Sequence, residues 1–247
     1  MKRRAGPDIG SRTVKLAVVE NNEIVFSKVL PTSHDPVAVC RELLSLAPHD
    51  ALVATGYGRH LAKEYFGCPV VSEIKAFASG AAFISPRCRT VLDIGGQDTK
   101  AVSLNENGKL DRFEMNDKCA AGTGRFLEIM ASALGYSMSD FISAASAAKD
   151  EQSINTTCTV FAESEVISLV NRGVSRDAIA RGIHRSVAAR AVSLLQRVSV
   201  RKDVLFAGGV ANNACVRTLV EEALGLSILI PENPQIIGAI GSALSSD

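Results

Sequence analysis

Short apolar runs that alternate with glycine turns occur twice in the first half of the chain. The first run begins at an Asp-Ile-Gly-Ser turn at Asp8 and predicts two successive strands, over residues 13–19 and 24–30. The same order of strand, glycine turn, strand and strand returns over residues 90–93, 94–104 and 110–115. The pattern therefore predicts two sheets that are built in the same way.

The two stretches also agree residue by residue. At an offset of 85 residues, the sequence Asp-Ile-Gly-Ser-Arg-Thr-Val-Lys from Asp8 aligns with Asp-Ile-Gly-Gly-Gln-Asp-Thr-Lys from Asp93. The identical pairs are Asp8 and Asp93, Ile9 and Ile94, Gly10 and Gly95, and Lys15 and Lys100. An internal repeat of this size implies two related lobes that face each other.

Most of the remaining pattern is helical. The spacing of apolar residues predicts helices over residues 36–47, 61–66, 73–84, 121–134, 139–147, 160–171, 176–198 and 234–244, and another helix that ends at residue 224. Short apolar runs predict strands over residues 51–55, 69–71, 204–207 and 228–230. No low-complexity linker interrupts these elements, so we expect the two lobes to be tightly joined.

Two cysteines stand just ahead of helical patterns. Cys119 lies in the sequence Asn-Asp-Lys-Cys-Ala-Ala-Gly-Thr-Gly-Arg-Phe-Leu, residues 116–127, and Cys158 lies in Thr-Thr-Cys-Thr-Val-Phe-Ala-Glu. We expect both at or just before a helix N-terminus, where unpaired N–H groups and the helix dipole favour a thiolate. The pair suggests a metal or redox site. Two small buried apolar side chains are the alternative, since no Cys-x-x-Cys motif is present.

Composition excludes several classes of function. The 247 residues suit one large or two small domains, and 47% hydrophobic and 21% charged residues are typical of a globular protein. The net charge is +1, Trp is absent and aromatic residues make up only 5%, which disfavours nucleic acid as a partner. No run approaches the roughly 18 apolar residues of a membrane helix, and no apolar leader follows the basic N-terminus. We therefore expect a cytoplasmic protein whose six cysteines form no structural disulfides.

The glycine turns suggest a phosphate site. A strand that ends in Asp and turns at Gly places a carboxylate beside exposed backbone N–H groups, which suits a metal–phosphate complex. Two such turns, together with Gly208 and Gly209 after a third strand, make a specific combination; two ordinary hairpin turns are the alternative. The sequence lacks the Gly-x-x-x-x-Gly-Lys and Gly-x-Gly-x-x-Gly patterns of P-loop and Rossmann sites.

The motifs resemble a known superfamily. The two Asp-Ile-Gly turns and Gly208-Gly209 are similar to those of sugar kinases, actin and the large heat-shock chaperones, which hold ATP between two ribonuclease-H-like lobes. The stretches from Asp93, Asn116, Cys158 and Phe206 narrow the resemblance to the activators of 2-hydroxyacyl-CoA dehydratases. That family, the BadF/BadG/BcrA/BcrD-type ATPases, includes the ATPase subunits of benzoyl-CoA reductases. The resemblance covers nearly the whole chain.

This resemblance implies an α/β fold with two ribonuclease-H-like lobes, each a mixed sheet with helices on both faces. The lobes would comprise residues 1–88 and 89–247, with a cluster-bearing helical insertion at about residues 116–172. We allow for a return of the closing helix to the first lobe.

The resemblance further implies a homodimer with one [4Fe–4S] cluster, held by Cys119 and Cys158 of both subunits. ATP binding and hydrolysis would drive single electrons at low potential from a ferredoxin or flavodoxin to an iron–sulfur dehydratase or reductase. Helix starts that face an anionic cluster fit this assignment. Cys40, Cys68, Cys88 and Cys215 are expected to be buried and structural, and His34, His49, His60 and His184 to be surface or structural.

For the nucleotide, the resemblance places three groups of residues. Asp8 and Asp93 would lie near Mg²⁺, and Gln97 would orient the attacking water. The ATP- or ADP-binding residues would be Ser11, Arg12, Thr13, Val14, Lys15, Gly95, Gly96, Gln97, Gly208, Gly209 and Gln235. Asp98 and Lys100 are candidates for a supporting role.

Two positions depart from the family pattern. Pro7 lacks an N–H and is unfavourable in an inner strand, so we expect the first strand to be short or distorted. Phe77 stands where relatives commonly carry His.

Two other functions remain open at the level of sequence. A small-molecule kinase of the same superfamily would need a catalytic carboxylate, which the sequence does not identify. A non-catalytic nucleotide sensor would dock a partner through the cysteine face.

Overall fold

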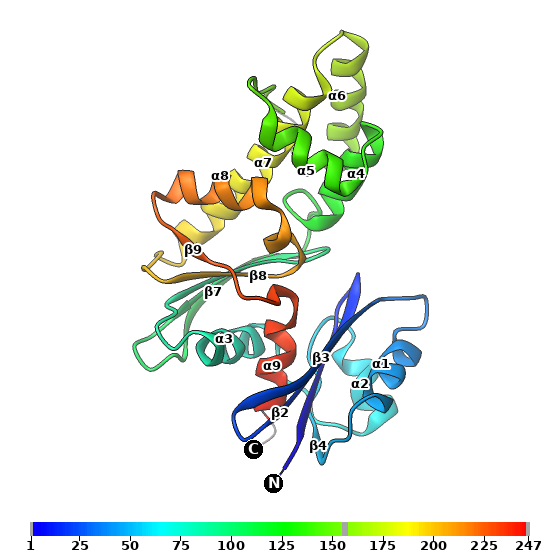
Figure 1. Ribbon diagram of the computed structural model, residues 1–247, viewed down its shortest axis with the longest axis vertical. Coiled ribbons are helices and arrows are strands. Elements are labelled where there is room, and N and C mark those ends of the chain that lie inside the picture. The colour runs from blue at the N-terminus through cyan, green and yellow to red at the C-terminus, as the bar shows by residue number, and fades with distance from the viewer. Residues whose placement is uncertain (1, 155–157, 246–247) are drawn as a thin grey trace.

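The computed structural model describes residues 2–154 and 158–245, and its two β-sheets follow one another along the long axis of the molecule (Figure 1). A group of helices forms one end, and both chain termini lie at the other end. The predicted α/β class with two mixed sheets is confirmed. Among the described residues, no helix is both long enough and apolar enough to span a membrane.

The first sheet has the strand order β3-β2-β1-β4. β1 pairs antiparallel with β2 and parallel with β4, so the sheet is mixed. Helix α1 packs on β1 and β2, and α9 (Ile237–Leu244) packs against the same two strands. The elements of this part are β1 (Arg4–Ile9), β2 (Thr13–Glu20), β3 (Glu23–Pro31), α1 (Pro36–Ser45), β4 (Ala51–Leu52) and α2 (Arg59–Phe66).

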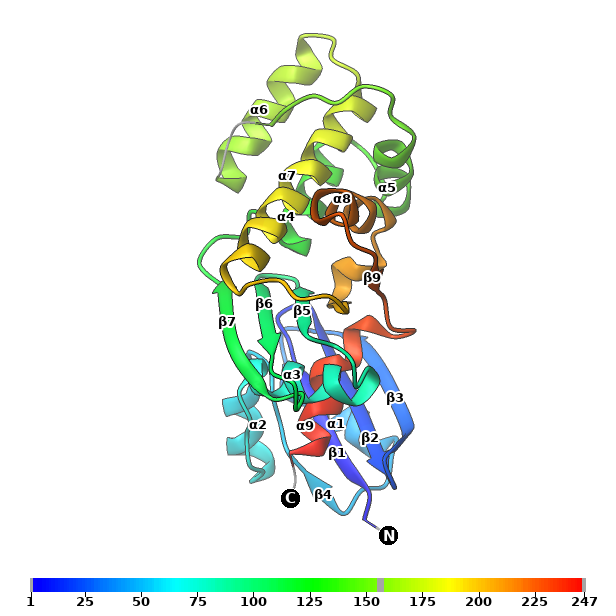
Figure 2. The same cartoon turned by 90° about the vertical axis from the view of Figure 1, so that its left-hand side faces the viewer.

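The second sheet has the order β7-β6-β5-β8-β9. Helices α7 and α3 both contact this sheet, and α8 packs along α7. Figure 2 shows the helical end beyond this sheet, where α4, α5 and α6 surround the far half of α7. The elements are α3 (Glu73–Ile84), β5 (Thr90–Ile94), β6 (Thr99–Leu104), β7 (Leu110–Asn116), α4 (Gly124–Ala133), α5 (Met138–Ala147), α6 (Thr159–Asn171), α7 (Arg176–Arg197), β8 (Val204–Ala207), α8 (Ala214–Leu224), β9 (Ile228–Leu229) and α9 (Ile237–Leu244).

The internal repeat is preserved in the strand registers. Asp8 pairs with Lys15 across β1 and β2, and Asp93 pairs with Lys100 across β5 and β6. The irregularities also correspond: the β2–β3 register shifts between residues 18 and 19, and the β6–β7 register shifts between residues 103 and 104. The offset of 85 residues therefore holds through the first two strands of each sheet, and it becomes 86 in the third strand. As a result, the two glycine turns occupy equivalent places in their sheets.

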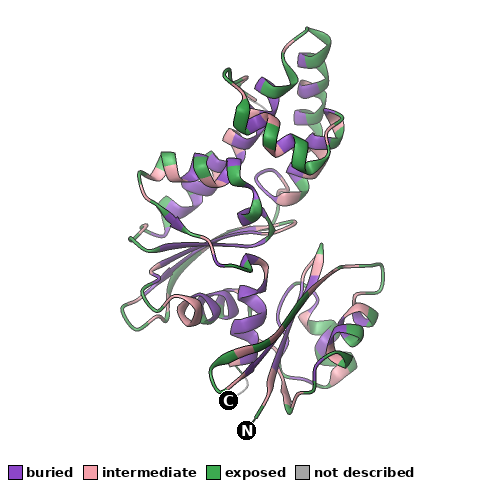
Figure 3. Cartoon of the chain, in the orientation of Figure 1, coloured by how far each residue is buried: buried purple, intermediate pink, exposed green. Residues whose placement is uncertain are grey.

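Helix α9 is buried from Ile237 to Ala243 (Figure 3) and joins the two parts of the molecule. It packs on β1, β2 and α3. The close contact depends on glycine, because a Cβ at Gly80 would lie 2.0 Å from the Ile237 carbonyl oxygen and one at Gly241 would lie 1.7 Å from that of Ala76. A 3-10 turn over Pro234–Ile236 precedes α9, so the closing segment is two elements rather than the single helix we expected. The predicted lobe boundaries stay a prediction.

The expectation for Pro7 is wrong, because β1 is a regular strand. It pairs with β2 over its whole length, including the pair of Pro7 with Leu16. In the parallel register with the neighbouring segment, Thr55 N–H donates to the Pro7 carbonyl, and an N–H at residue 7 would point toward the Val53 carbonyl. That carbonyl instead accepts a hydrogen bond from the buried Ser242 hydroxyl of α9. A side chain from the far end of the chain thus replaces the donor that proline lacks.

The start of α4 also differs from the prediction, which placed Cys119 at or just before it. The helix begins at Gly124, five residues after Cys119. Gly122 has φ +91° and Thr123 is extended, and neither conformation continues a helix. Cys119 therefore lies in the β7–α4 loop, whereas Cys158 is the N-cap residue of α6, as predicted.

Smaller differences concern strands. The predicted strand over residues 69–71 is reduced to one bridge between Ala54 and Val70, and that over 51–55 to the two residues of β4 and an isolated bridge at Thr55. The predicted run over 94–104 contains the glycine turn, and β6 begins only at Thr99.

Candidate functional site

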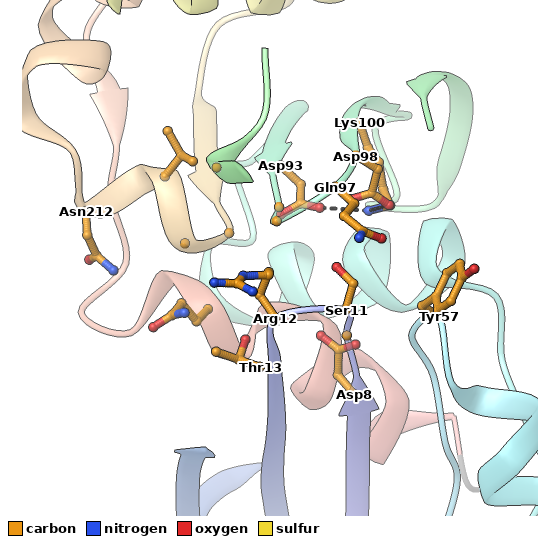
Figure 4. A pocket seen from close by; sticks show the side chains of 18 of the residues that line it. Asp8, Ser11, Arg12, Thr13, Tyr57, Asp93, Gln97, Asp98, Lys100 and Asn212 are labelled. Atoms are coloured by element: carbon orange, nitrogen blue, oxygen red, sulfur yellow. Dashed lines mark hydrogen bonds and ion pairs between the residues drawn. The ribbon is translucent and has the colours of Figure 1, made fainter. Parts of the chain in front are cut away.

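A cavity of about 350 Å³ lies between the two sheets and is lined by both glycine turns. Its volume falls in the range of small-molecule sites. In Figure 4, Asp93, Gln97, Asp98 and Lys100 enter from the second sheet, and Asp8, Ser11, Arg12 and Thr13 enter from the first. The cavity therefore lies where the ends of β1 and β5 face each other.

Most of the residues predicted to bind nucleotide line this cavity. They are Asp8, Ser11, Arg12, Thr13, Lys15, Asp93, Gly95, Gly96, Gln97, Gly208, Gly209 and Gln235. Val14 does not line it, since its side chain is fully buried in the apolar cluster of the first sheet. Cys119 and Cys158 lie outside the cavity.

Each sheet carries the same ion pair at the cavity. Lys15 Nζ lies 3.3 Å from Asp8 Oδ2, and Lys100 Nζ lies 3.0 Å from Asp93 Oδ2. Both pairs are cross-strand neighbours, so the repeat of Asp-Ile-Gly followed by Lys produces them. Two lysines and two aspartates thus face the same space from opposite sides, an arrangement that can hold both phosphate oxygens and a cation.

Lys100 is the most enclosed of these charges. Its Nζ also lies 2.7 Å from Asp98 Oδ2 and 3.0 Å from Glu73 Oε2, and it sits 5.4 Å from the centre of the Phe77 ring. Burial alone would lower the pKa of Lys100, but the three carboxylates outweigh it and raise the pKa, so the ammonium group stays charged. Phe77 supplies the apolar floor and a cation–π contact to this ammonium.

Asp93 has one satisfied and one unsatisfied carboxylate oxygen. Oδ2 accepts from Lys100, while the buried Oδ1 has no hydrogen-bond partner. Burial raises the pKa of Asp93 to about 6, and Lys100 opposes that rise. An unpartnered buried oxygen is costly, and a bound cation or its water would relieve it. Gly208, at φ +85°, leaves room for this oxygen, since a Cβ there would lie 2.4 Å from Asp93 Oδ1.

The third glycine segment borders the other end of the cavity. Gly208 N–H donates to the Pro234 carbonyl at 2.9 Å, which holds the turn after β8 against the segment before α9. Gly209 is exposed, and Gln235 Nε2 is its nearest neighbour. This open surface without a side chain permits a flat group to approach the backbone.

The cysteines divide into two classes. Cys40, Cys68, Cys88 and Cys215 are buried, and burial raises the pKa of Cys40 to about 12 and that of Cys88 to about 11, which makes them inert thiols. Cys119 is partly buried and Cys158 is exposed. Cys158 caps α6 without a side-chain hydrogen bond to the helix, so the first N–H groups of α6 remain available to an anion.

Sequence reasoning missed several residues that line the cavity. Glu73 is the first residue of α3 and follows its N-cap Ser72. An acidic residue is common at a helix start, so nothing in the sequence pattern assigned Glu73 to the cavity. Tyr57 lies in the glycine-rich loop before α2, and the sequence pattern there gave no sign of a functional role. Asn212 follows the Gly208-Gly209 pair by a few residues, and the asparagine pair there was the one signal that could have found it.

A buried histidine supports the cavity wall from behind. His184 Nδ1 lies 2.8 Å from the Ala180 carbonyl, and Nε2 lies 3.0 Å from Asn213 Nδ2. Asn213 lines the cavity and caps α8 by accepting from Val216 N–H. The amide donates to Nε2, which fixes a neutral ring with its proton on Nδ1. Burial lowers the pKa of His184 to about 4.

This histidine gives the fold a pH dependence. The folded pKa of His184 is below that of an unfolded histidine, so its contribution is fully present above about pH 6.5 and is lost as the pH falls toward 4. We expect the free energy of unfolding to fall by about 2 kcal/mol between pH 7 and pH 5 for this reason. Urea denaturation of the wild type and of His184→Gln at both pH values measures it, with the exposed His60→Gln as control. An unchanged pH dependence in His184→Gln would contradict the assignment.

The chain matches a known protein family over nearly its whole length. The family model described as the BadF/BadG/BcrA/BcrD ATPase family matches residues 5–246. The chain is 42% identical to the (R)-2-hydroxyglutaryl-CoA dehydratase activating ATPase of Acidaminococcus fermentans, over 97% of this chain and 95% of that protein.

Two solved structures are similar over almost their full length. Component A of the A. fermentans (R)-2-hydroxyglutaryl-CoA dehydratase superposes with a TM-score of 0.91 at 41% identity, covering 100% of this chain and 98% of that one. The activator of the 2-hydroxyisocaproyl-CoA dehydratase from Clostridium difficile, with bound ADPNP, superposes with a TM-score of 0.89 at 41% identity, covering 99% and 94%.

Proposed function

The chain belongs to the BadF/BadG/BcrA/BcrD ATPase family, and from that premise we propose that it is a reductive activator, a homodimer in which ATP hydrolysis drives single electrons into a partner iron–sulfur enzyme. The observation that carries the proposal is the pairing of two features. One is a cavity with two Asp–Lys pairs facing each other, and the other is a pair of thiols close to helix starts at the helical end.

The cavity fits ATP. Lys15 and the backbone of the turn from Ser11 to Thr13 offer cationic and N–H donors from the first sheet, and Gly95 and Gly96 offer backbone from the second. Gly208, Gly209 and Gln235 border the adenosine end in this assignment. The related activator with bound ADPNP supports this use of the cavity.

The donor set also fits Mg²⁺. Asp93 presents a buried oxygen without a protein partner, and Asp8 lies across the cavity. These two carboxylates are the residues that would hold the ion through its water shell. When bound, Mg²⁺ neutralises charge on the phosphate oxygens. Lys100 keeps Asp93 oriented, and in this assignment the exposed Gln97, which lines the cavity, orients a water molecule.

The thiols fit half of a [4Fe–4S] site. Cys119 and Cys158 are the two cysteines that are not buried, whereas an iron–sulfur cluster of this type takes four thiolates. Within residues 2–154 and 158–245 of one chain, no group of three or more His, Cys, Asp or Glu side chains is placed to hold a metal ion. Two copies related by a two-fold axis supply the four ligands. When bound, the cluster carries the electron, and the N–H groups at the start of α6 face its negative charge.

The fold supplies a physical connection between the two features. Helix α4 begins next to the second glycine turn and follows directly on the Cys119 loop. Helix α6, which begins at Cys158, packs against α4. A change in the cleft therefore reaches both ligand-bearing segments through one helix.

Anaerobic assays of the purified protein test the proposal. The activator should hydrolyse ATP without phosphorylating a second substrate, and it should reduce a dehydratase of the related type only when ATP is present. A protein that instead transfers phosphate to a sugar or acid would support the small-molecule kinase. A protein that binds ATP without hydrolysing it would support the nucleotide sensor. Either result contradicts the proposal.

A further inference from the structure

Glu128 directly follows the cysteine motif of residues 116–127 and belongs to neither the predicted nucleotide site nor the predicted cluster site. It lies on the second turn of α4 and lines the cavity. Arg12, in the turn between β1 and β2, reaches it from the other sheet, with Nη2 at 2.8 Å from Oε2 and Nε at 3.3 Å from Oε1. Two parallel contacts of a guanidinium with a carboxylate fix the orientation of both groups. The first glycine turn is thus connected directly to α4.

Arg12 crosses the second glycine turn to make this contact. A Cβ at Gly96 would lie 2.2 Å from Arg12 Cγ and 3.3 Å from Ser11 Oγ. The stem of the arginine therefore rests on the backbone of Gly96, where any side chain would block it. Both glycine turns meet at this point, beside the space assigned to the phosphates.

The second glycine turn holds the same part of α4. The N–H groups of Gly124 and Arg125 donate to the carbonyls of Gly95 and Gly96, both at 2.9 Å. The N-cap residue Thr123 makes no side-chain hydrogen bond to the helix, so this turn serves the first amides of α4 in its place. The start of α4 therefore contacts both glycine turns. The first turn binds Glu128 through Arg12, and the second turn accepts hydrogen bonds from the first N–H groups of the helix.

The pair leaves part of Arg12 available. It uses the Nε and Nη2 edge of the guanidinium, and the Nη1 donors take no part in it. The Arg12 side chain is 48% exposed and the Glu128 side chain is 34% exposed, so the ion pair adds little to the stability of the fold. Its effect is to orient Arg12 toward the cavity and to connect that orientation with α4.

We propose that Glu128 is a positioning residue that couples the nucleotide to α4. It orients the Arg12 guanidinium toward a bound phosphate, and nucleotide binding in the cavity thereby changes the conformation of α4 and of the Cys119 loop that precedes it. The proposal rests on the proposed function in taking ATP as the ligand. A ligand shifts a structural equilibrium only by its differential affinity for the two states. A phosphate that binds Arg12 in one orientation changes the free energy of the Arg12–Glu128 pair and hence of α4.

Hydrogen exchange of the peptide over residues 116–128 tests the coupling, with and without a saturating non-hydrolysable ATP analogue. In the wild type, we expect the analogue to change exchange rates there about tenfold, an ordinary coupling strength. In Glu128→Gln, the analogue still binds, but the change falls below about twofold. Arg125→Gln is the matched control, because Arg125 contacts Glu128 at 3.0 Å within α4 and does not line the cavity. It should respond as the wild type does.

A double variant that swaps the two charges distinguishes coupling to the nucleotide from a purely structural role of the ion pair. The double variant Arg12→Glu with Glu128→Arg re-forms an ion pair but removes the phosphate donor at residue 12. At an analogue concentration that saturates this double variant, we expect the analogue still not to change the hydrogen-exchange rates over residues 116–128 as it does in the wild type. Recovery would show that the pair is only a structural brace and would overturn the proposal, as would a wild-type response in Glu128→Gln.

Hydrogen exchange can be measured without iron in the protein. The experiment therefore distinguishes an error in the proposed function from an error in the role of Glu128. If the wild type binds no ATP analogue at all, the proposed function is wrong and this inference falls with it. If the analogue binds and Glu128→Gln responds normally, only the role of Glu128 is wrong.

Discussion

Replacing Asp93 by asparagine should lower the rate of ATP hydrolysis about a hundredfold, the usual cost of removing one positioned charged group from a reaction site. Asp93 offers the one buried carboxylate oxygen in the described cavity that has no protein partner, and Asn would place a neutral group there. In this variant the buried Lys100 ammonium group still forms ion pairs with Asp98 and Glu73, so its charge remains neutralised and the protein should fold. Steady-state phosphate release and a thermal denaturation curve measure the two effects.

Asp98→Asn is the matched control for this prediction. Asp98 makes the shortest contact with the same lysine, at 2.7 Å, but its side chain is 26% exposed and its carboxylate can be replaced by solvent. We expect its rate to fall less than about tenfold, because a partly exposed ion pair contributes little. If Asp93→Asn hydrolyses ATP within threefold of the wild type, or if the two variants behave alike, Asp93 is not the residue that holds the cation.

Replacing Cys158 by serine should remove the iron from the protein. The proposed cluster takes two thiolates from each subunit, so a dimer purified anaerobically should hold about four irons, and the variant should hold fewer than about one. Cys119→Ser should give the same result. Iron and sulfide analysis measures the content, and sedimentation measures whether two chains of 26.1 kDa associate.

Cys215→Ala is the control for the cysteine variants. Cys215 is buried against the same helical core, and its pKa is raised by burial, so its thiol is not a ligand. Iron content should be unchanged in this variant. A Cys158→Ser protein that keeps its iron, or a Cys215→Ala protein that loses it while remaining folded, would contradict the assignment of the ligands.

Much of the cavity could be predicted because it is encoded locally and twice. The pairs of Asp8 with Lys15 and Asp93 with Lys100 each lie within one hairpin, so a motif of eight residues determines both the turn and the charge pair. Helix α3 and strand β8 begin and end at the residues we expected, since strong apolar periodicity and clear boundaries coincide there.

What could not be predicted depends on contacts between distant parts of the chain. Arg12 and Glu128 are 116 residues apart, and the hydroxyl of Ser242 that lets Pro7 occupy an inner strand is 189 residues from its acceptor. No local pattern reports such pairs. The late start of α4 is a different case, because the positive φ of Gly122 breaks an apolar pattern that reads as continuous helix.

If the protein works as proposed, nucleotide in the cavity changes the environment of the shared thiols. This change can be measured as the rate at which an iron chelator extracts iron from the reduced, anaerobic dimer, with and without a non-hydrolysable ATP analogue. We expect the analogue to change this rate about tenfold or more, since closure of the cavity moves α4 and the segments that carry Cys119 and Cys158. Equal rates with and without the analogue, at concentrations shown to saturate the cavity, would contradict the proposal.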